Sequence, residues 1–475
     1  MMIFKRLYQE QLSQASYLIG CSTTKEAVMI DPHRDIDLYI DTAAREGVQI
    51  VAVTETHIHA DFASGAYELA LRTGARLYLS AAGPEDWSYL YTQEAAAVPL
   101  HDGDQIQVGH VQLDVLATPG HTPEHIAFLV TDTAEATEPM GICTGDFIFV
   151  GDVGRPDLLE KVAGVAGNKE AAAESLFQSL QRVRAFPDYL QIWPGHGAGS
   201  PCGRALGAVP QSTLGYEKRF NWAFAPGQRE DFVRSILTGQ PEPPHYFVQM
   251  KRINRDSPTL LRTQSQPAQL SADQLDTQLA SGSMIIDLRP ADQYAAGHIM
   301  GTVSLPISGP FLTWSGWLLP YDQPLLLIGD AYEVRAARRQ LRLIGLDNIA
   351  GFWTREDMLA WQLNGHTFTR SAQIDVPHVQ TLLQEDAITI IDVRAVAEFA
   401  SGCIPASRNI PLGDFLQRID DIPTDQPVVI LCLGGTRSAI GASLLEAHGR
   451  TNIFNLTGGF QAWQKTNATV VYATV

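Results

Sequence analysis

The sequence predicts a multidomain α/β protein, and three observations support this fold class. The chain has 475 residues, which is enough for about three domains. Histidine and aspartate residues recur directly after short apolar runs of the kind that form buried strands, and helical segments follow. Residues 285–306 are repeated at 390–411 without gaps. A repeat separated by this much sequence indicates a duplicated domain and not a solenoid.

The first polar element follows the apolar run 50–56 and precedes a helix expected from about Ser64. It reads THIHADF at 56–62, so His57, His59 and Asp61 lie on one turn where they can converge on a metal ion. This segment resembles the H-x-H-x-D-H motif of the metallo-β-lactamase fold, with Phe62 in place of the last histidine. Phenylalanine has no lone pair to donate. The motif therefore favours one metal ion over a pair.

Three further candidate ligands lie downstream, each after an apolar run and each beside glycine or proline. His121 stands in TPGHTPEH after the run 111–117, Asp146 in CTGDFIF after 140–143, and His196 in WPGHG after 189–193. Glycine and proline turn the chain, so these side chains are expected at strand ends. Several such elements in order predict a metal site.

The N-terminal part resembles a persulfide dioxygenase, an iron-containing branch of the metallo-β-lactamase superfamily with the αββα fold. The segment FIFVGDVGRPD at 147–157 strengthens the resemblance. The resemblance implies that one Fe(II) per chain is bound by His57, His121 and Asp146, which leaves adjacent positions open for a sulfur substrate and O2. The matching residues that would orient ligands and water are His59, Asp61 and His196. Position 62 is not an iron ligand in that family, so Phe62 weakens the case for zinc hydrolysis more than the case for oxygenation.

The repeat resembles the opening strand and helix of a rhodanese domain, a sulfurtransferase fold with a parallel sheet. In the two copies Asp287 matches Asp392 and Arg289 matches Arg394. The segment 457–463, TGGFQAW, resembles the closing part of that domain. The fold class is therefore an αββα domain followed by two rhodanese-like α/β domains, predicted at 1–255, 263–366 and 372–475.

The two copies differ at the catalytic loop. In the C-terminal copy the apolar run 428–431 leads into Cys432 and a C-x4-R loop ending at Arg437, followed by a helix to about His448. The helix dipole and Arg437 would favour the Cys432 thiolate. The predicted cradle for the sulfur anion is Leu433, Gly434, Gly435 and Thr436. The middle copy has no cysteine between residues 203 and 402, so we predict an inactive domain that spaces or joins the others.

Composition excludes several classes of partner. The formal net charge of −18 disfavours nucleic acid and anionic membranes. An anionic substrate therefore needs a local basic group, for which Arg155, Lys218 and Arg219 are candidates. No apolar run is long enough to span a membrane, and the first residues do not resemble a secretion signal. Five cysteines do not form a disulfide framework. We expect a cytoplasmic protein, and the resemblance implies a homo-oligomer, either dimer or tetramer.

The predicted function joins the two chemistries. A thiol persulfide would react with O2 to give sulfite and free thiol, and Cys432 would transfer sulfur to form thiosulfate. Cys202 lies on the loop after His196 and is either a persulfide relay or a cysteine without a role. Two alternatives are a two-zinc thioester hydrolase resembling glyoxalase II and a non-catalytic sulfur carrier. The sequence leaves open the thiol and the direction of the rhodanese step.

Overall fold

The computed structural model describes residues 1–475 apart from 159, 161–168, 226, 265, 467 and 473–475. The chain forms two compact units, Met1–Gln264 with Arg342–Gly345, and Ser265–Leu341 with Leu346–Val475. The first unit carries the predicted metal motifs and the second carries the repeat. We retain 1–255, 263–366 and 372–475 as proposed domain boundaries. Within the described residues, no helix combines the length and apolar character needed to cross a bilayer.

The first unit contains two six-stranded sheets. The first sheet has the order β1(Met2–Gln9), β2(Gln14–Cys21), β3(Glu26–Ile30), β4(Gln49–Thr54), β5(Arg76–Ser80) and β6(Val98–Leu100). The second has the order β12(Ser212–Thr213), β11(Gln191–Pro194), β10(Gly141–Gly145), β9(Ile126–Asp132), β8(Val111–Ala117) and β7(Gln105–Val108). The helices include α1(Asp37–Glu46), α2(Ala66–Thr73), α4(Lys169–Arg184), α5(Leu214–Phe220), α6(Arg229–Leu237) and α7(Phe247–Asp256).

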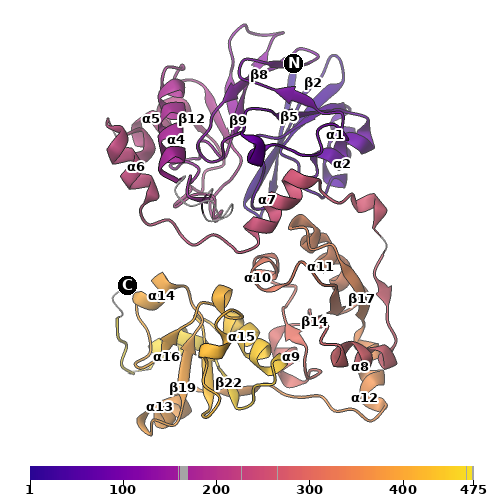
Figure 1. Ribbon diagram of the computed structural model, residues 1–475, viewed down its shortest axis with the longest axis vertical. Helices are drawn as coiled ribbons and strands as arrows, with labels where there is room; N and C mark the ends of the chain where they lie inside the picture. Colours follow the sequence, from indigo (N-terminus) through magenta and orange to yellow (C-terminus); the bar gives the residue numbers. More distant parts are fainter. Residues whose placement is uncertain (159, 161–168, 226, 265, 467, 473–475) are drawn as a thin grey trace. The chain divides into compact units, whose positions relative to one another are not determined.

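Alternating side chains of β2 show how these layers are held together. Tyr17 and Ile19 belong to the buried cluster between the sheets, together with Phe128 of β9. Leu18 points the other way, into the cluster that includes Tyr39 of α1. Such a period of two is expected of a strand buried on both faces. In Figure 1 helices α1 and α2 flank one side of the strands and α4 to α6 the other, which confirms the αββα layers.

Strand β4 ends at Thr54, two positions before the end of the predicted run, and the difference has a local cause. The backbone N–H of Thr56 donates to Asp31 Oδ1 at 2.7 Å instead of continuing the ladder. This side-chain bond releases the chain from the sheet. The residues that follow Thr56 are the metal motif, so the early exit places it beyond the sheet edge. Helix α2 then begins at Ala66, close to the predicted start.

The second unit contains two five-stranded parallel sheets with equivalent strand orders. The middle copy has β13(Ala268–Gln269), β17(Ile349–Trp353), β16(Leu325–Ile328), β14(Met284–Asp287) and β15(Val303–Ser304). The C-terminal copy has β18(Ala372–Ile374), β22(Ile453–Leu456), β21(Val428–Leu431), β19(Thr389–Asp392) and β20(Arg408–Asn409). Their helices are α8(Ala272–Ala280), α9(Ala291–Ala296), α10(Phe311–Leu318), α11(Ala331–Leu343) and α12(Arg355–Leu363), then α13(Val376–Gln384), α14(Val396–Ala400), α15(Thr436–Ala447) and α16(Gly459–Gln464).

The repeated aspartate and arginine have the same structural task in both copies. Arg394 donates to the Asp392 carboxylate, at 2.6 Å for the shortest bond, and to the Gly402 carbonyl at 2.8 Å. Arg289 bonds Asp287 in the same way at 2.5 Å. The pair ties the end of the first strand to the turn after the first helix. The repeated aspartate and arginine therefore stabilise the fold of each copy and are not evidence of catalysis in both.

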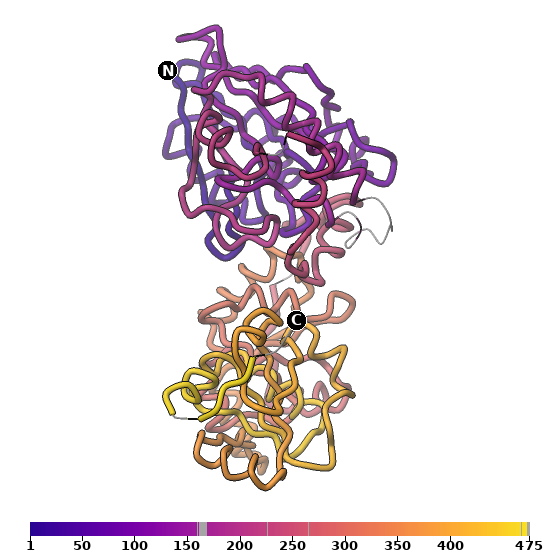
Figure 2. The backbone as a smooth tube through the Cα atoms, turned by 90° about the vertical axis from the view of Figure 1, so that its left-hand side faces the viewer, coloured from indigo at the N-terminus to yellow at the C-terminus, as the bar shows by residue number. Residues whose placement is uncertain are grey.

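The two copies lie side by side within this unit (Figures 1 and 2). Helix α15, which follows the Cys432 loop, packs against β15 of the middle copy. The backbone N–H of Ser304 donates to Ser443 Oγ of α15 at 3.0 Å, and both residues are buried. The helix behind the predicted sulfurtransferase loop is thus anchored by the copy that lacks a cysteine.

Candidate metal centre and sulfurtransferase site

Glycines allow the loops of the metal site to approach closely. Gly120 has a φ of +149°, and a Cβ there would lie 2.4 Å from Leu176 Cβ on α4. Gly145 has a φ of +49°, and a Cβ would lie 2.4 Å from Thr56 Oγ1. Only glycine fits such contacts without strain. The residues directly after them are His121 and Asp146, so close packing of the loops fixes two of the predicted ligands.

The structure brings His57, His121 and Asp146 together. Asp146 Oδ2 lies 4.0 Å from His57 Nε2 and 3.5 Å from His121 Nε2. One ligand atom from each residue lies within 4.8 Å of the others, and all three residues are buried. The second ring nitrogens are already occupied, because His121 Nδ1 donates to the Arg155 carbonyl at 3.0 Å and His57 Nδ1 lies 2.9 Å from Thr56 Oγ1. Both Nε2 atoms therefore face the carboxylate.

The polar atoms at the centre of this group fit a metal ion. His57 Nε2 and Asp146 Oδ2 are buried without a hydrogen-bond partner, an arrangement that is costly unless a cation takes their lone pairs. Burial and the neighbouring His59 lower the pKa of His57, and burial lowers the pKa of His121. Burial alone would raise the pKa of Asp146, but His196 and the other histidines hold it well below the ordinary value. Neutral imidazoles and an ionised carboxylate are the protonation states that bind metals.

His196 joins two carboxylates beside the triad. Its Nδ1 lies 2.7 Å from Asp146 Oδ1, and its Nε2 lies 2.7 Å from Asp61 Oδ2. Burial opposes protonation, but Asp146 and Asp61 raise the pKa of His196 well above its ordinary value. His196 thus orients Asp146 from behind, as expected for a residue that positions a ligand.

Cys202 lies beside Asp61 and His196. Asp61, His196 and Cys202 form a second buried group whose ligand atoms lie within 4.8 Å of one another. Cys202 is 1% exposed, and its carbonyl accepts the Arg155 N–H at 3.1 Å. Burial, followed by the Asp146 and Asp61 carboxylates, raises the pKa of the Cys202 thiol.

His59 and Phe62 pack on one another next to the triad. Their ring centroids are 4.3 Å apart, and Phe62 is fully buried. His59 Nε2 lies 3.2 Å from Asp31 Oδ1. Burial would lower the pKa of His59, but the Asp31 carboxylate raises it to about 9. Asp31 was missed in the sequence, although its place at the end of an apolar run beside a proline matches the pattern of the other site residues.

Two more supporting residues were missed. His125 Nε2 accepts the backbone N–H of Asp146 at 3.1 Å, and its Nδ1 bonds Thr118 Oγ1 at 2.8 Å. Asn254 on α7 donates to the carbonyls of His59 and Phe62, both at 2.7 Å. His125 belongs to the TPGHTPEH motif and could have been found. Asn254 had no signal, because it lies 195 positions from His59 in the sequence.

The basic residues suggested for drawing an anion are engaged elsewhere. Arg155 is fully buried and donates to both oxygens of Asp157, at 2.8 and 2.6 Å. Lys218 bonds Asp188 Oδ1 at 2.6 Å. The expectation was wrong for Arg155 and Lys218, because a charge already paired with a carboxylate is a poor anion receptor.

Two groups of the described Cys432 loop and its helix lie near the sulfur, while Leu433, Gly434 and Thr436 stay predicted members of the cradle. Gly435, at a φ of +109°, donates its N–H to Cys432 Sγ at 3.1 Å, and Ser438 Oγ lies 3.5 Å from the sulfur. The first turn of α15 begins directly after Gly435. The segment 457–463 holds this loop in place, because the Phe460 N–H donates to the Cys432 carbonyl at 2.7 Å. A Cβ on Gly459 would lie 2.3 Å from that carbonyl oxygen.

Arg437 is bound to a carboxylate that sequence reasoning missed. Its two terminal nitrogens donate to Glu398 at 2.6 and 2.8 Å. The hydrogen bonds to Glu398 are the main reason that the pKa of Arg437 is raised, with a further contribution from Cys432. Glu398 matches Gln293 of the middle copy in the gapless alignment, so the repeat itself differs where the chemistry differs.

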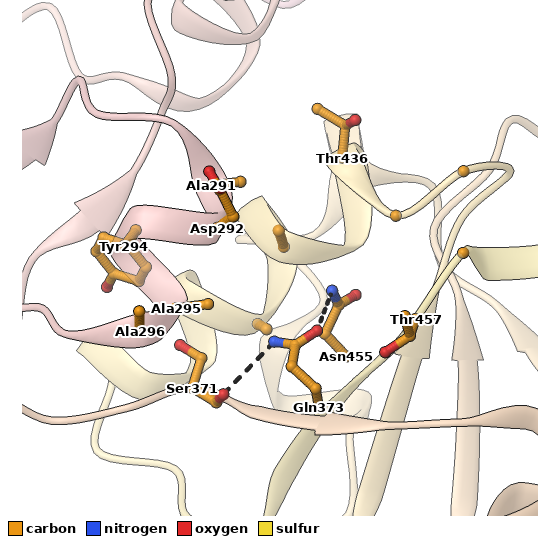
Figure 3. A pocket seen from close by; sticks show the side chains of 15 residues that line it. Ala291, Asp292, Tyr294, Ala295, Ala296, Ser371, Gln373, Thr436, Asn455 and Thr457 are labelled. Carbon is orange, nitrogen blue, oxygen red and sulfur yellow. Dashed lines mark hydrogen bonds between the residues drawn. The ribbon is translucent and has the colours of Figure 1, made fainter.

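Two cavities adjoin the loop, and the middle copy lines both. One of about 380 Å³ includes Cys432 and Arg437, with Pro310, Thr313 and Trp314 contributed by the middle copy. The other, of about 470 Å³, lies against α9 of the middle copy (Figure 3). Both volumes are in the range of small-molecule sites. The copy without a cysteine therefore does more than space its neighbours.

Fold and side chains together define a metal-binding protein with a sulfurtransferase-like second half. The family model described as metallo-beta-lactamase superfamily matches residues 10–196, and the rhodanese-like domain model matches 271–355 and 375–466. A crystal structure of a metallo-beta-lactamase from Staphylococcus aureus subsp. aureus COL is 44% identical, with a TM-score of 0.66, and the match covers 74% of this chain and 99% of that one. The chain belongs to the metallo-β-lactamase superfamily and carries tandem rhodanese-like domains.

Curated relatives of the N-terminal part have more than one activity. The mitochondrial persulfide dioxygenase ETHE1 of Bos taurus is 27% identical over 41% of this chain and 68% of its own length. A probable polyketide biosynthesis zinc-dependent hydrolase, BaeB of Bacillus velezensis, is 24% identical over 45% of this chain and 85% of its own length. A hydroxyacylglutathione hydrolase-like protein of Homo sapiens is 29% identical over 38% and 54%.

Proposed function

We propose that this protein oxidises a thiol persulfide with O2 at one iron ion and transfers sulfur at Cys432 to form thiosulfate. The observation that carries the proposal is the buried group of two imidazoles and one carboxylate, with His57 Nε2 and Asp146 Oδ2 unpartnered. Two histidines and a carboxylate are the ligand set of non-haem Fe(II) oxygenases. A ferrous ion held there would supply the redox chemistry by which O2 oxidises sulfur.

The first reaction balances without another reductant. One persulfide R–S–SH, one O2 and one water give R–SH, sulfite and two protons. The triad residues would hold the ion, while His196 keeps Asp146 oriented through the 2.7 Å bond to its other oxygen. Burial of the site excludes bulk water, which protects a persulfide from side reactions.

The second reaction uses Cys432. Its thiolate attacks the terminal sulfur of another persulfide, the S–S bond of that persulfide breaks, and the thiol R–SH leaves with a proton. Sulfite then attacks the outer sulfur of the Cys432 persulfide, which gives thiosulfate and returns the thiolate. Gly435 N–H, which lies 3.1 Å from Sγ, would stabilise the anion in both states. The opposite direction, from thiosulfate to persulfide, uses the same residues.

The alternative function is a two-zinc hydrolase, because some relatives of the N-terminal part are named as hydrolases. It needs a second metal, and Phe62 supplies no ligand where the motif of such enzymes has histidine. A thioester hydrolase also leaves the Cys432 loop without a purpose. The oxygenase is therefore favoured.

Metal analysis and product analysis test the proposal together. The purified protein should contain about one iron per chain and consume O2 with a persulfide, giving thiosulfate. Cys432→Ser should keep O2 uptake but release sulfite in place of thiosulfate. Cys403→Ser is the matched control, since Cys403 is also buried in the C-terminal copy but outside the loop. Two zinc ions per chain with no O2 uptake would refute the oxygenase.

Cys202 is proposed as a persulfide relay that serves the metal pocket. Its support is its place beside Asp61 and His196. Cys202→Ser should keep the iron but lower thiosulfate formation relative to O2 uptake, whereas Cys143→Ser, another buried thiol of the same unit, should not. Unchanged product ratios in Cys202→Ser would remove the relay.

All five cysteines are free, which supports our proposal that the protein works in the reducing cytoplasm. We also propose that the protein forms a homo-oligomer.

A further inference from the structure

One contact between the two rhodanese-like copies takes no part in the reactions above. His298 lies in the turn after α9 of the middle copy, and Glu446 lies in the last turn of α15 of the C-terminal copy. Glu446 Oε2 is 3.6 Å from His298 Nε2. His298 is fully buried, and the Glu446 side chain is 11% exposed. An acid and a base are thus enclosed together where the two copies meet.

The ring of His298 is fixed, so its neighbours determine where it carries its hydrogen. Its Nδ1 lies 3.1 Å from the Tyr294 carbonyl, and because a carbonyl only accepts, Nδ1 is the donor. The ring also stacks on the Tyr294 ring, with a centroid distance of 4.0 Å and an interplanar angle of 6°. In neutral His298 the other nitrogen, Nε2, is therefore an acceptor, and it is buried without a hydrogen-bond partner. The group that it faces is Glu446.

The pair fits together when it holds one proton. A protonated Glu446 can donate to neutral His298, and an ionised Glu446 can accept from charged His298. Without that proton the lone pair of Nε2 faces a carboxylate, and both acceptors lose their donor, which costs free energy in a buried place. Closing the gap of 3.6 Å to hydrogen-bond distance needs a shift of less than about 1 Å.

Burial makes the two groups compete for this proton. It raises the pKa of Glu446, although the Ser371 hydroxyl, which donates to Oε2 at 2.9 Å, lowers it. Burial lowers the pKa of His298. Because the ordinary pKa of a histidine is higher than that of a glutamate, these shifts bring the two values closer together. Groups with similar pKa values in contact titrate as a pair and not one by one.

The other ionisable groups around the pair leave it to hold the proton by itself. Those that face it from the middle copy are Asp287, Arg289 and Tyr294. Asp287 raises the pKa of His298 and Arg289 lowers it, and the two bond each other at 2.5 Å, so their effects oppose. The Tyr294 hydroxyl donates to the Thr302 carbonyl at 2.6 Å. Two charged or ionisable neighbours in the sequence are exposed to solvent, Arg370 beside Ser371 and His448 beyond Glu446.

Helix α15 links this pair to the reactive sulfur. Its last turn carries Glu446, and its first turn follows directly after Gly435, whose N–H donates to Cys432 Sγ at 3.1 Å. About one turn before Glu446, Ser443 Oγ accepts the Ser304 N–H of the middle copy at 3.0 Å. Both contacts fix the same end of the helix against the middle copy. A change at the pair therefore moves the helix that carries the Cys432 loop at its other end.

We propose that His298 and Glu446 form a proton-linked contact that positions α15, so that sulfur transfer at Cys432 is faster while the pair holds its proton. This inference rests on the proposed sulfur transfer at Cys432. Both are positioning residues, because neither lines the cavity that contains Cys432. As pH rises, the proton passes to bulk water and the contact is lost. The raised pKa of Glu446 puts this loss above the ordinary glutamate value of 4.5.

The test compares the native protein with Glu446→Gln, whose amide donates to His298 Nε2 at every pH and imitates the protonated carboxyl. Without O2, thiosulfate gives its outer sulfur to the Cys432 thiolate of the full-length protein and leaves as sulfite. The rate of this step is measured between about pH 5 and about pH 9, and dividing the native rate by the variant rate removes the titration of Cys432 itself. The ratio should fall about fivefold as pH rises, which is the effect of one hydrogen bond.

Glu385→Gln is the matched control, because Glu385 lies exposed at the end of α13. The ratio of native rate to Glu385→Gln rate should not depend on pH. Hydrogen exchange of the Ser304 amide reads the position of α15 without any chemistry, since Ser443 Oγ accepts this N–H. After correction for the intrinsic rate, its protection should fall with rising pH in the native protein and stay constant in Glu446→Gln.

The two measurements separate this inference from the function on which it rests. A rate ratio independent of pH, or Ser304 protection that stays constant in the native protein, would overturn the proton-linked contact and leave sulfur transfer intact. A native protein that forms no Cys432 persulfide at any pH would overturn the sulfur transfer instead, and the exchange of Ser304 would still decide whether the contact holds a proton.

Discussion

Replacing Gly120 by alanine tests whether contact with α4 positions His121. The new Cβ would lie 2.4 Å from Leu176 Cβ, 2.6 Å from its Cα and 2.8 Å from its nitrogen. These are partly backbone atoms of a buried helix, so the loop must move. The φ of +149° adds strain of about 1–3 kcal/mol for any residue with a side chain, and forced packing adds about 1–3 kcal/mol more.

Gly47→Ala is the matched control for this change. Gly47 also has a positive φ, +65°, but a Cβ there would meet nothing within 4 Å. The control should therefore show the strain alone, about 1–2 kcal/mol. The unfolding temperature of the N-terminal unit should be lower in Gly120→Ala than in the control, by at least about 2 °C.

The functional readout is metal content. Because His121 precedes a turn and its Nδ1 bonds the Arg155 carbonyl, a shift of the loop should pull Nε2 away from Asp146. Gly120→Ala should lose iron and O2 uptake together, whereas Gly47→Ala should keep both. Equal stability and equal iron content in the two variants would show that the loop is not held by α4 and refute the reasoning.

Other predictions concern the metal, the hydrogen bonds that Asn254 makes to the metal motif, and a buried carboxylate. Chelation of the metal should lower the unfolding temperature of the N-terminal unit, since the ion binds the native state and satisfies unpartnered buried atoms; calorimetry with and without chelator checks this, and an unchanged temperature contradicts it. Asn254→Ala removes three hydrogen bonds, two of 2.7 Å to the His59 and Phe62 carbonyls and one of 2.8 Å from the Ser64 N–H. It should lower the free energy of unfolding in denaturant by about 2–3 kcal/mol and weaken metal retention; unchanged stability would show that these bonds are dispensable. Burial raises the pKa of Glu446, so the folded state takes up a proton more readily than the unfolded state and loses stability as pH rises from the unfolded value through the folded one. Glu446→Gln should therefore be more stable than the native protein at pH 8 but not at pH 4, and a difference independent of pH would disprove this assignment.

Much of the metal site could be predicted because its signals are local. His57, His121 and Asp146 each follow an apolar run and a turn, and such a pattern is readable from the sequence alone. The structure brings these three side chains within reach of one ion. The roles of these residues stay predictions until the metal is measured.

The sequence by itself determined the kinds of chemistry: imidazole and carboxylate at strand ends, a single cysteine loop in the second of two copies, and phenylalanine where a second metal would need a ligand. Only the tertiary structure decided which partners complete these groups. Asn254 and Glu398 act on residues to which no local pattern links them, and the Cys432 loop borders a cavity that one copy alone does not form. The physical reason is that strand periodicity is written in neighbouring residues, whereas hydrogen-bond satisfaction and cavities depend on segments that meet only after the sheets have packed.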